Sequence, residues 1–325
     1  MNSPLLSELP PPPHGKTGWP WTETPKPLPD RMPDGSEWPK ISIVTPNYNY
    51  GRFLEETIRS VLLQGYPNLE YIIVDGGSND NSVEIIKKYE PWLAYWVSEP
   101  DQGQVDSINK GLQRATGKWF NWLNSDDILL RDALKILATI SKFQADAGWI
   151  SGTSLLLSEE GSIVDYWVPW RTEPYILGLR YSSFPQDATF IRLEFMRQHG
   201  ISLHPELSNV FDTLLHWQLL KFGNPLLTPA CLSAMRLHPQ QKTAHLENRT
   251  REVKNWLEPQ EKTLSLWSRI WLRLLRTRFS RLFHSLLGIG ISYGLPPKTQ
   301  TWKAVIYDQQ RYEWKLVAAR DAVLF

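Results

Sequence analysis

The sequence predicts an α/β protein with a mostly parallel central sheet, Rossmann-like and flanked by helices. Three observations lead to this prediction. Between residues 40 and 140, short strand-like apolar runs alternate with segments of helical spacing, the loops between them are short, and each strand-like run ends in polar residues. Alternation of this kind is typical of βαβ units, whose strands are parallel. The carboxyl ends of such strands meet at one edge, where α/β proteins bind ligands.

The first half of the chain supplies four strands and the helices between them. The predicted strands are ISIVT (41–45), LEYIIVD (69–75), LAYWVS (93–98) and KWFNWL (118–123). The predicted helices are 52–64, which ends at Gly65, 83–89, with Ser82 as its N-cap, and 105–115. Four polar clusters follow these strands, at 47–49, 75–78, 99–103 and 125–127, and we expect them to converge at one edge of the sheet.

The second half is less regular and is flanked by two extensions. Further strands are expected at 149–157, 162–170, 187–192 and 225–238, and further helices at 128–140, 210–223 and 264–294. Residues 1–39 are rich in proline, which can neither donate to a sheet ladder nor sit inside a helix, so they predict an extended arm. We expect one domain over 40–250, divided into a nucleotide-sugar-binding half (40–128) and an acceptor half (129–250), and a largely helical C-terminal extension (251–325).

Composition excludes several classes of protein. Thirty-five basic residues face 34 acidic ones, so no net field draws the chain to nucleic acid. The single cysteine, Cys231, rules out a disulfide framework within the chain and suits a reducing compartment. No signal peptide is recognisable and no run of about 18 apolar residues occurs. These features predict a cytoplasmic protein.

The adjacent carboxylates Asp126 and Asp127 directly follow the strand 118–123. Two carboxylates at a strand end can hold Mg²⁺ or Mn²⁺, hard cations that prefer oxygen and that bridge a protein to a diphosphate. A solvated turn in which Asp126 caps the helix 128–140 is the other interpretation. Convergence with the other polar strand ends favours the cation site.

Asp75, at the tip of the strand 69–75, has two interpretations as well. Its carboxylate can accept hydrogen bonds from a nucleobase or ribose, or it can cap the turn GGS that follows. The first strand is not followed by GxGxxG, and GxxxxGK[ST] occurs nowhere, which disfavours dinucleotide dehydrogenases and P-loop enzymes. Any phosphates are therefore handled in another way, and a bound metal would serve.

The motifs of residues 40–140 resemble a known family. The run SIVTPNYNYGRFLEETIRSVLLQGYPNLEYIIVDGGSNDNSVEII, followed by EPDQGQVDSINKGLQRATGKWFNWLNSDD, is similar to the nucleotide-sugar-binding half of family 2 glycosyltransferases, which have the GT-A fold. A weaker resemblance continues to about residue 245. It implies an enzyme that transfers a sugar from a nucleotide-diphospho-sugar to an acceptor hydroxyl with inversion, using Mn²⁺ or Mg²⁺, in the assembly of cell-surface polysaccharide or glycolipid.

The resemblance also assigns roles by position. It implies donor contacts for a set of residues in the first four loops, namely Thr45, Pro46, Tyr48, Asp75, Gln102, Gly103, Asn109 and Asp126. It implies that Asp127 and His238 lie at the metal and that Asp212 is the general base. The base segment departs from the family pattern, since Leu214 replaces a second acid and Phe211 a frequent glutamate, and Glu206 and Asp187 are alternative bases.

The altered base segment supports a rival hypothesis, a non-catalytic nucleotide-sugar-binding or membrane-recruited scaffold subunit. Residues 264–294 combine helical apolar spacing with arginines gathered on another face. That pattern is typical both of a helix lying in a membrane interface, next to a lipid-linked or other glycan acceptor, and of a helix packed on the domain. The first interpretation predicts peripheral contact with the inner face of a membrane.

Overall fold

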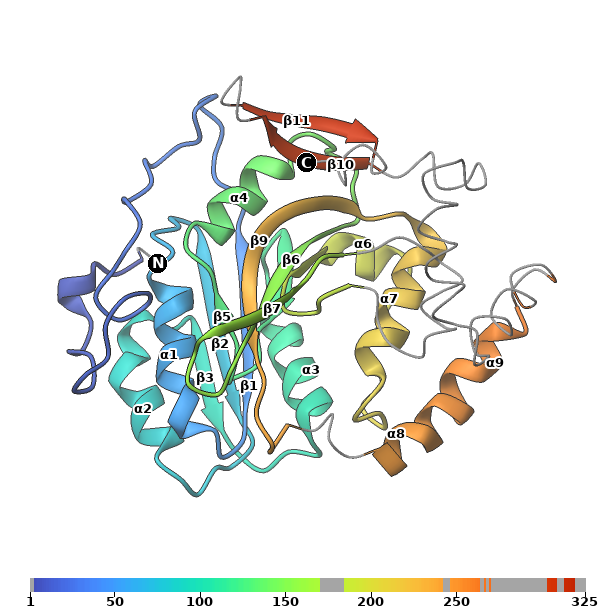
Figure 1. Cartoon of the computed structure of the whole chain (residues 1–325), viewed down its shortest axis with the longest axis horizontal. Coiled ribbons are helices and arrows are strands. Elements are labelled where there is room, and N and C mark those ends of the chain that lie inside the picture. The colour runs from blue at the N-terminus through green and yellow to red at the C-terminus, as the bar shows by residue number, and fades with distance from the viewer. Residues whose placement is uncertain are drawn as a thin grey trace.

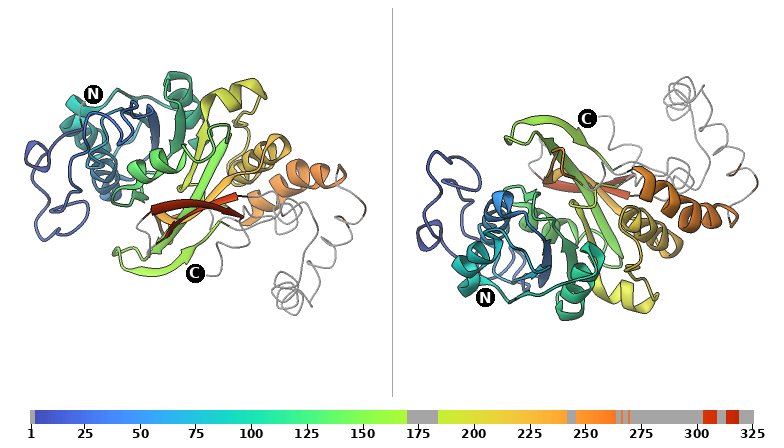
Figure 2. Two further views of the ribbon diagram at one scale, coloured as in Figure 1. Left: turned by 90° about the horizontal axis from the view of Figure 1, so that it is seen from above. Right: turned by 90° about the horizontal axis from the view of Figure 1, so that it is seen from below.

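The structure is a computed structural model that describes residues 3–169, 184–241, 246–263, 266, 269, 303–308 and 313–318. Within these ranges the strands form a single mixed sheet in the order β11-β10-β9-β6-β8-β4-β1-β2-β3, to which β5 and β7 add by pairing with β9 and β6. Helices cover both faces of this curved sheet (Figures 1 and 2). The predicted α/β class is confirmed.

The half of the sheet formed by the first four strands is parallel, as predicted. Its four strands are β1 (Ile41–Asn47), β2 (Leu69–Asp75), β3 (Tyr95–Ser98) and β4 (Trp119–Trp122). β1 lies between β2 and β4, and β3 is the outer strand. The register places Asn47 opposite Asp75, and Asp75 opposite Ser98. The polar strand ends therefore meet at one edge.

Alternate residues of these strands face different helices. Ile43 and Ile73 pack into one core cluster with α1 (Gly51–Leu62) and α2 (Ser82–Tyr89). Val44 and Val74 pack into the cluster on the opposite face, under α3 (Gln104–Arg114). Both faces are apolar because both are covered, which is why these strands read as unbroken apolar runs.

The second half contains β5 (Ile128–Leu129), α4 (Ala133–Ile140), β6 (Trp149–Leu157), β7 (Ile163–Trp167), β8 (Thr189–Arg192), α6 (Leu193–Gln198), α7 (Phe211–Phe222) and β9 (Leu226–Arg236). The predicted helix 128–140 is wrong at its start. Ile128 and Leu129 pair with β9 instead, and the helix begins after Asp132, whose φ of 64° turns the chain. Asp126 is therefore not a helix cap. Ser82 is likewise the first residue of α2 and not its N-cap, which is Asn81.

β7 is an exposed strand that pairs with β6 and with no other described strand. Three apolar side chains of this strand are well exposed, namely Ile163 (65%), Val164 (56%) and Tyr166 (64%).

The N-terminal arm contains the short 3₁₀ turn η1 (Leu6–Glu8) and packs on the domain. A second 3₁₀ turn, η2 (Glu90–Trp92), follows α2 in the domain, and its Trp92 packs against the same apolar cluster. Arg59 of α1 is completely buried beneath the arm and donates to the carbonyl oxygens of Pro10 (2.8 Å), Pro20 (3.2 Å) and Trp21 (3.0 Å). The arm contains turns, at 14–15 and 19–22, and a buried guanidinium holds it on the domain.

The C-terminal extension contributes both helix and strand. α8 (Leu246–Glu252), the π-helical turn η4 (Val253–Leu257) and α9 (Glu258–Glu261) run on from one another, and β10 (Lys303–Asp308) and β11 (Glu313–Ala318) join the sheet beyond β9. The predicted amphipathic helix 264–294 lies outside the described residues, apart from 266 and 269. Among the described residues, no helix has both the length and the apolar character needed to cross a bilayer.

Candidate active site

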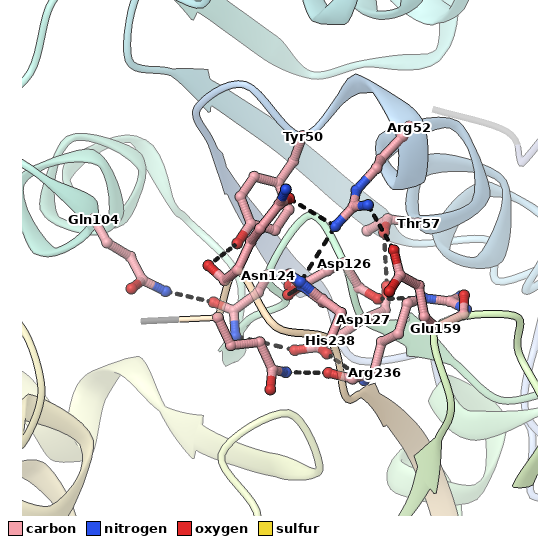
Figure 3. A network of polar contacts seen from close by, with 12 residues as sticks. Tyr50, Arg52, Thr57, Gln104, Asn124, Asp126, Asp127, Glu159, Arg236 and His238 are labelled. Atoms are coloured by element: carbon pink, nitrogen blue, oxygen red, sulfur yellow. Dashed lines mark hydrogen bonds and ion pairs between the residues drawn. The ribbon is translucent and has the colours of Figure 1, made fainter. Parts of the chain in front are cut away.

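The adjacent aspartates lie in a loop at the carboxyl edge of the sheet, between β4 and β5. Two long-range hydrogen bonds fix the main chain of this loop. Thr57 Oγ1 of α1 donates to the Asp127 carbonyl (2.7 Å), and Arg236 Nε of β9 donates to the Asp126 carbonyl (3.2 Å). Segments from both halves of the domain therefore hold the pair in place (Figure 3).

Asp127 is buried, and both of its carboxylate oxygens accept hydrogen bonds within the protein. Oδ1 accepts from the Arg236 backbone N–H (3.1 Å) and Oδ2 from Asn124 Nδ2 (3.0 Å). Burial raises the pKa of the Asp127 carboxyl well above its usual value, and the negative charges of Asp126 and Asp187 raise it further. The predicted metal ligand is thus engaged by the protein itself.

Asp126 has a different environment. Its Oδ2 lies 2.9 Å from His238 Nε2, and His238 is the one described side chain that hydrogen-bonds this carboxylate. Burial raises the pKa of Asp126, while the hydrogen bond from His238 opposes that shift. Because its oxygens are less engaged than those of Asp127, Asp126 is the better placed of the two to bind a cation.

The contacts of His238 define its tautomer. Arg52 Nη2 lies 3.3 Å from His238 Nδ1, and a guanidinium can only donate, so Nδ1 is the acceptor. The ring proton is then on Nε2 and is donated to Asp126. Neither ring nitrogen is available to a metal while Arg52 stays in this position. The prediction that His238 approaches the metal therefore requires Arg52 to move.

Arg236 compensates the negative charge of the aspartate loop. It is 2% exposed, and its Nη2 forms an ion pair with Glu56 Oε2 of α1 (3.2 Å). Its Nη1 donates to the Glu159 carbonyl (3.1 Å) beside β7, while Arg52 forms an ion pair with the Glu159 side chain (2.6 Å). Two cations thus flank the two aspartates, as Figure 3 shows.

Asp75 is completely buried at the tip of β2. Its carboxylate accepts four hydrogen bonds, from Asn47 Nδ2 (2.6 Å), Ser78 Oγ (2.6 Å), the Ser78 backbone N–H (2.9 Å) and Ser98 Oγ (2.6 Å). These bonds tie together the ends of β1, β2 and β3. Contact with a base or ribose stays a prediction, and in this arrangement it requires some of these bonds to open.

The other predicted donor residues lie along the same edge. Thr45 and Pro46 are buried at the end of β1, where Thr45 Oγ1 shares a hydrogen bond with Tyr71 OH (3.0 Å). Tyr48 is 58% exposed just beyond them. Gln102 is exposed, and Gly103, with φ of 113°, precedes α3.

Asn109 behaves differently from the other predicted donor residues. Its side chain binds within the protein, since Nδ2 donates to the Leu203 carbonyl (3.1 Å). It therefore anchors the loop before α7.

Asp212 is the second residue of α7. The Phe211 ring lies 5.9 Å from that of Trp122, the last residue of β4, so α7 begins near the edge that carries the aspartate loop. Asp212 Oδ1 accepts from the Thr213 backbone N–H (2.6 Å) and from Thr213 Oγ1 (3.3 Å). Burial raises the pKa of Asp212, and these bonds oppose the shift.

The alternative bases fit less well. Asp187 is buried inside the sheet, where its Oδ2 accepts from Ser154 Oγ and from Ser233 Oγ (2.6 Å). Glu206 is an exposed loop residue 3.5 Å from His204 Nδ1. Asp187 precedes β8, whose first residue lies at the carboxyl end of β4, but the two serine hydroxyls already bind its Oδ2. Glu206 lies on an exposed loop.

Four residues of the site carried no signal in the sequence. Gln104 Nε2 donates to Asn124 Oδ1 (2.6 Å), and Asn124 in turn binds Asp127. Arg52 and Arg236 supply the positive charge. A helix-start glutamine, a strand-end asparagine and two arginines are common surface residues, and only their convergence distinguishes them.

The side chains of the site could supply part of the coordination of a divalent cation. Within the described ranges, no group of three or more His, Cys, Asp or Glu side chains could by itself hold a metal. Mg²⁺ and similar ions commonly use one or two carboxylates and take their other ligands from water and substrate phosphates. Asp126 can provide such a carboxylate, beside a second buried carboxylate whose charge favours a cation.

Comparisons with known proteins agree with this geometry. The model of the family "Glycosyl transferase family 2" matches residues 42–150. The match covers 109 of the 325 residues of the chain. It contains β1 to β4 and the aspartate loop.

Several curated proteins are similar to part of this chain. An uncharacterized glycosyltransferase of Mycobacterium tuberculosis is 40% identical over 90 residues, which are 27% of this chain and 34% of that protein. The putative teichuronic acid biosynthesis glycosyltransferase TuaG of Bacillus subtilis is 32% identical over 133 residues, 40% of this chain and 52% of TuaG. The match thus spans between a third and about half the length of these relatives.

Solved structures share the fold. Residues 1–349 of TarS from S. aureus in complex with UDP-GlcNAc match with a TM-score of 0.59 and 17% identity, over 80% of this chain and 77% of that one. The mannosyltransferase PcManGT of Pyrobaculum calidifontis, in complex with GDP-Man and Mn²⁺, matches with a TM-score of 0.50 and 18% identity over 84% and 85% of the chains. At this identity the likeness concerns the fold.

Proposed function

We propose that this chain is a metal-dependent, inverting glycosyltransferase that moves a sugar from a nucleotide-diphospho-sugar to an acceptor hydroxyl. One observation carries the proposal. A carboxylate with spare coordination, Asp126, lies at the carboxyl edge of a family 2 domain, and a candidate base, Asp212, begins a helix near the same edge. The complexes of TarS with UDP-GlcNAc and of PcManGT with GDP-Man support a nucleotide-sugar donor.

The residues at this edge of the sheet have different roles under this proposal. The tips of β1 to β3 and the start of α3 bind and orient the nucleotide, with Tyr48 exposed for stacking on a base. Asp126 would hold a divalent ion, whose positive charge would stabilise the negative charge of the diphosphate leaving group. Asp127, fixed by Asn124 and by the Arg236 backbone, orients the loop and adds to its negative charge.

The acceptor hydroxyl is too weak an acid to attack unaided. Asp212 would accept its proton as the new bond forms at the anomeric carbon, opposite the departing diphosphate. A single displacement of this kind inverts the anomeric centre. The raised pKa of Asp212 makes its carboxylate a stronger base than an exposed aspartate, provided that it is ionised at the working pH.

The acceptor is a cell-surface polysaccharide or glycolipid under this proposal. The name of TuaG, a putative teichuronic acid biosynthesis glycosyltransferase, supports a polymer of the cell envelope.

A panel of UDP-, GDP- and dTDP-sugars tests the proposal. The chain is incubated with each donor and Mn²⁺, and release of nucleoside diphosphate is measured with and without polyol or glycan acceptors. We expect turnover with one donor, loss of turnover on chelation, and loss in Asp212→Asn. A chain that binds a donor yet turns over none would support the scaffold hypothesis.

Paired variants test the metal assignment. Asp126→Asn should abolish the Mn²⁺-dependent part of donor affinity, measured by calorimetry, because it removes the carboxylate with open coordination. Asp127→Asn should retain most of that affinity and chiefly change the free energy of unfolding. If Asp127→Asn abolished this affinity and Asp126→Asn retained it, Asp127 would be the metal ligand, as predicted from the sequence.

A further inference from the structure

The start of α7 has no cap of its own. Helices leave their first backbone N–H groups without partners inside the helix, and a side chain at the N-cap position usually satisfies one of them. The N-cap of α7 is Val210, which has no side-chain acceptor. The candidate base Asp212 lies two residues further on, so a contact that fixes the backbone just before the helix also fixes the base.

Glu252, the last residue of α8, binds the backbone that leads into α7. Its Oε1 accepts from the Ser208 backbone N–H (3.0 Å) and Ser208 Oγ (2.8 Å). Its Oε2 accepts from the backbone N–H groups of Asn209 (2.8 Å) and Val210 (3.1 Å). One buried carboxylate therefore binds three consecutive backbone N–H groups immediately before α7.

We propose that Glu252 is a positioning residue for the transfer reaction, which sets the place and direction of Asp212 by clamping the start of α7. The inference rests on the proposed function. Glu252 touches neither the donor edge nor Asp212 itself, so it acts through the backbone of residues 208–210. In Figure 1, α8 lies beside the lower end of α7, where that helix begins.

A second residue of the same helix supports this role. Arg249 precedes Glu252 by about one helical turn on α8, and its positive charge lowers the pKa of Asp212. α8 thus acts on the base through two charges, one at the helix start and one near the carboxyl group. α8 is also the next described helix after β9, whose last residue, Arg236, binds Asp127.

The experiment compares Glu252→Gln with a matched control, Glu70→Gln. Glutamine retains one acceptor oxygen, but its NH₂ group replaces the second oxygen of the carboxylate. That NH₂ group would point at backbone N–H groups, which are donors as well, so those hydrogen bonds are lost. Glu70 is also a buried carboxylate that binds a backbone N–H, that of Thr116 (2.7 Å), together with Ser42 Oγ (2.6 Å). It lies near the amino end of β2, away from the aspartate edge.

We expect both variants to be less stable, but only Glu252→Gln to lower kcat, by tenfold or more, with the donor KM within twofold of wild type. Hydrogen exchange of the amides of residues 208–213 should accelerate in Glu252→Gln and stay unchanged in Glu70→Gln. Both variants are assayed well below their unfolding temperatures, so that kcat refers to folded protein.

The possible failures are distinguishable. Equal kcat for Glu252→Gln and wild type would overturn the positioning role and leave the proposed function intact. Unchanged exchange of residues 208–213 would overturn the clamp itself, with or without an active enzyme. Absence of turnover by the wild-type chain would overturn the proposed function and, with it, the role of Glu252 in transfer.

Discussion

Replacing Arg59 with methionine should loosen the N-terminal arm. Methionine keeps an unbranched stem of similar length and removes every donor, so the carbonyls of Pro10, Pro20 and Trp21 lose their partner. Those three hydrogen bonds involve the arm, and the fourth joins Arg59 to Tyr89 OH of α2 (3.2 Å). The substitution therefore acts on arm docking more than on the core of the domain.

The magnitude follows from the contacts. A hydrogen bond from a charged group contributes roughly 1.5 kcal/mol or more, so three of them contribute about 4–5 kcal/mol. Part of this is offset, because the variant no longer keeps a guanidinium out of water, which costs several kcal/mol for an ion. We expect the free energy of unfolding to fall by about 2–3 kcal/mol, as these opposing effects partly cancel.

Urea unfolding and limited proteolysis measure the two consequences. Arg59→Met should lower the urea midpoint and expose residues 1–40 to protease before the domain unfolds. Arg131→Met is the matched control, since Arg131 pairs with Glu23 of the arm at the surface, where an ion pair contributes less than about 1 kcal/mol. A change below about 0.5 kcal/mol in Arg59→Met, with the arm still protected, would refute the reasoning.

Three further predictions concern the site and the core. Thr213→Val removes a hydroxyl that stabilises the ionised form of Asp212, so the pKa of Asp212 should rise further. The acid limb of the pH profile of kcat should then move to higher pH. If the limb does not move, Asp212 is not the titrating base. Gln104→Ala should weaken donor binding roughly three- to tenfold in calorimetry, which corresponds to the loss of about one hydrogen bond. The reason is that Asn124 loses the partner that orients it toward Asp127. Unaltered affinity would show that the aspartate loop keeps its conformation without Gln104. Burial lowers the pKa of His216 to about 3 from an ordinary 6.5, so between these pH values the unfolded chain binds a proton that the folded chain does not. The free energy of unfolding should therefore fall as the pH drops from 6.5 towards 3. His216→Phe should make the urea midpoint less dependent on pH in this range, and an equally steep decline would show that other groups cause it.

The parallel half of the fold was predictable because its physics is local. Strands covered on both faces are apolar throughout, and the helices between them show their buried faces as periodic apolar residues, as in 41–45 and 52–64. The start of α4 was not, because the pairing of Ile128 with Ala234 outweighs the helical pattern that this segment carries. A contact between residues more than a hundred positions apart cannot be recognised in the sequence around either residue.

The same distinction applies to the site. The polar strand ends indicated which loops converge, and Asp126 and Asp127 follow from that rule. Which of the two remains open to a cation depends on the Arg236 backbone N–H, which binds Asp127 across 109 positions of the chain. Arg59 shows the same effect in the core, since an arginine within an amphipathic helix reads as a surface residue until its carbonyl partners are known.

The outer rim of β7 has a consequence for how this protein behaves in concentrated solution. A strand that pairs on its second side with no described strand, and which displays Ile163, Val164 and Tyr166 to water, offers a template for another chain. Association strand to strand needs no unfolding of the interior, so turbidity or early elution in gel filtration should grow with concentration while the molecule is still native. A lysine in place of Val164 would place a charge on this rim and keep the molecules apart.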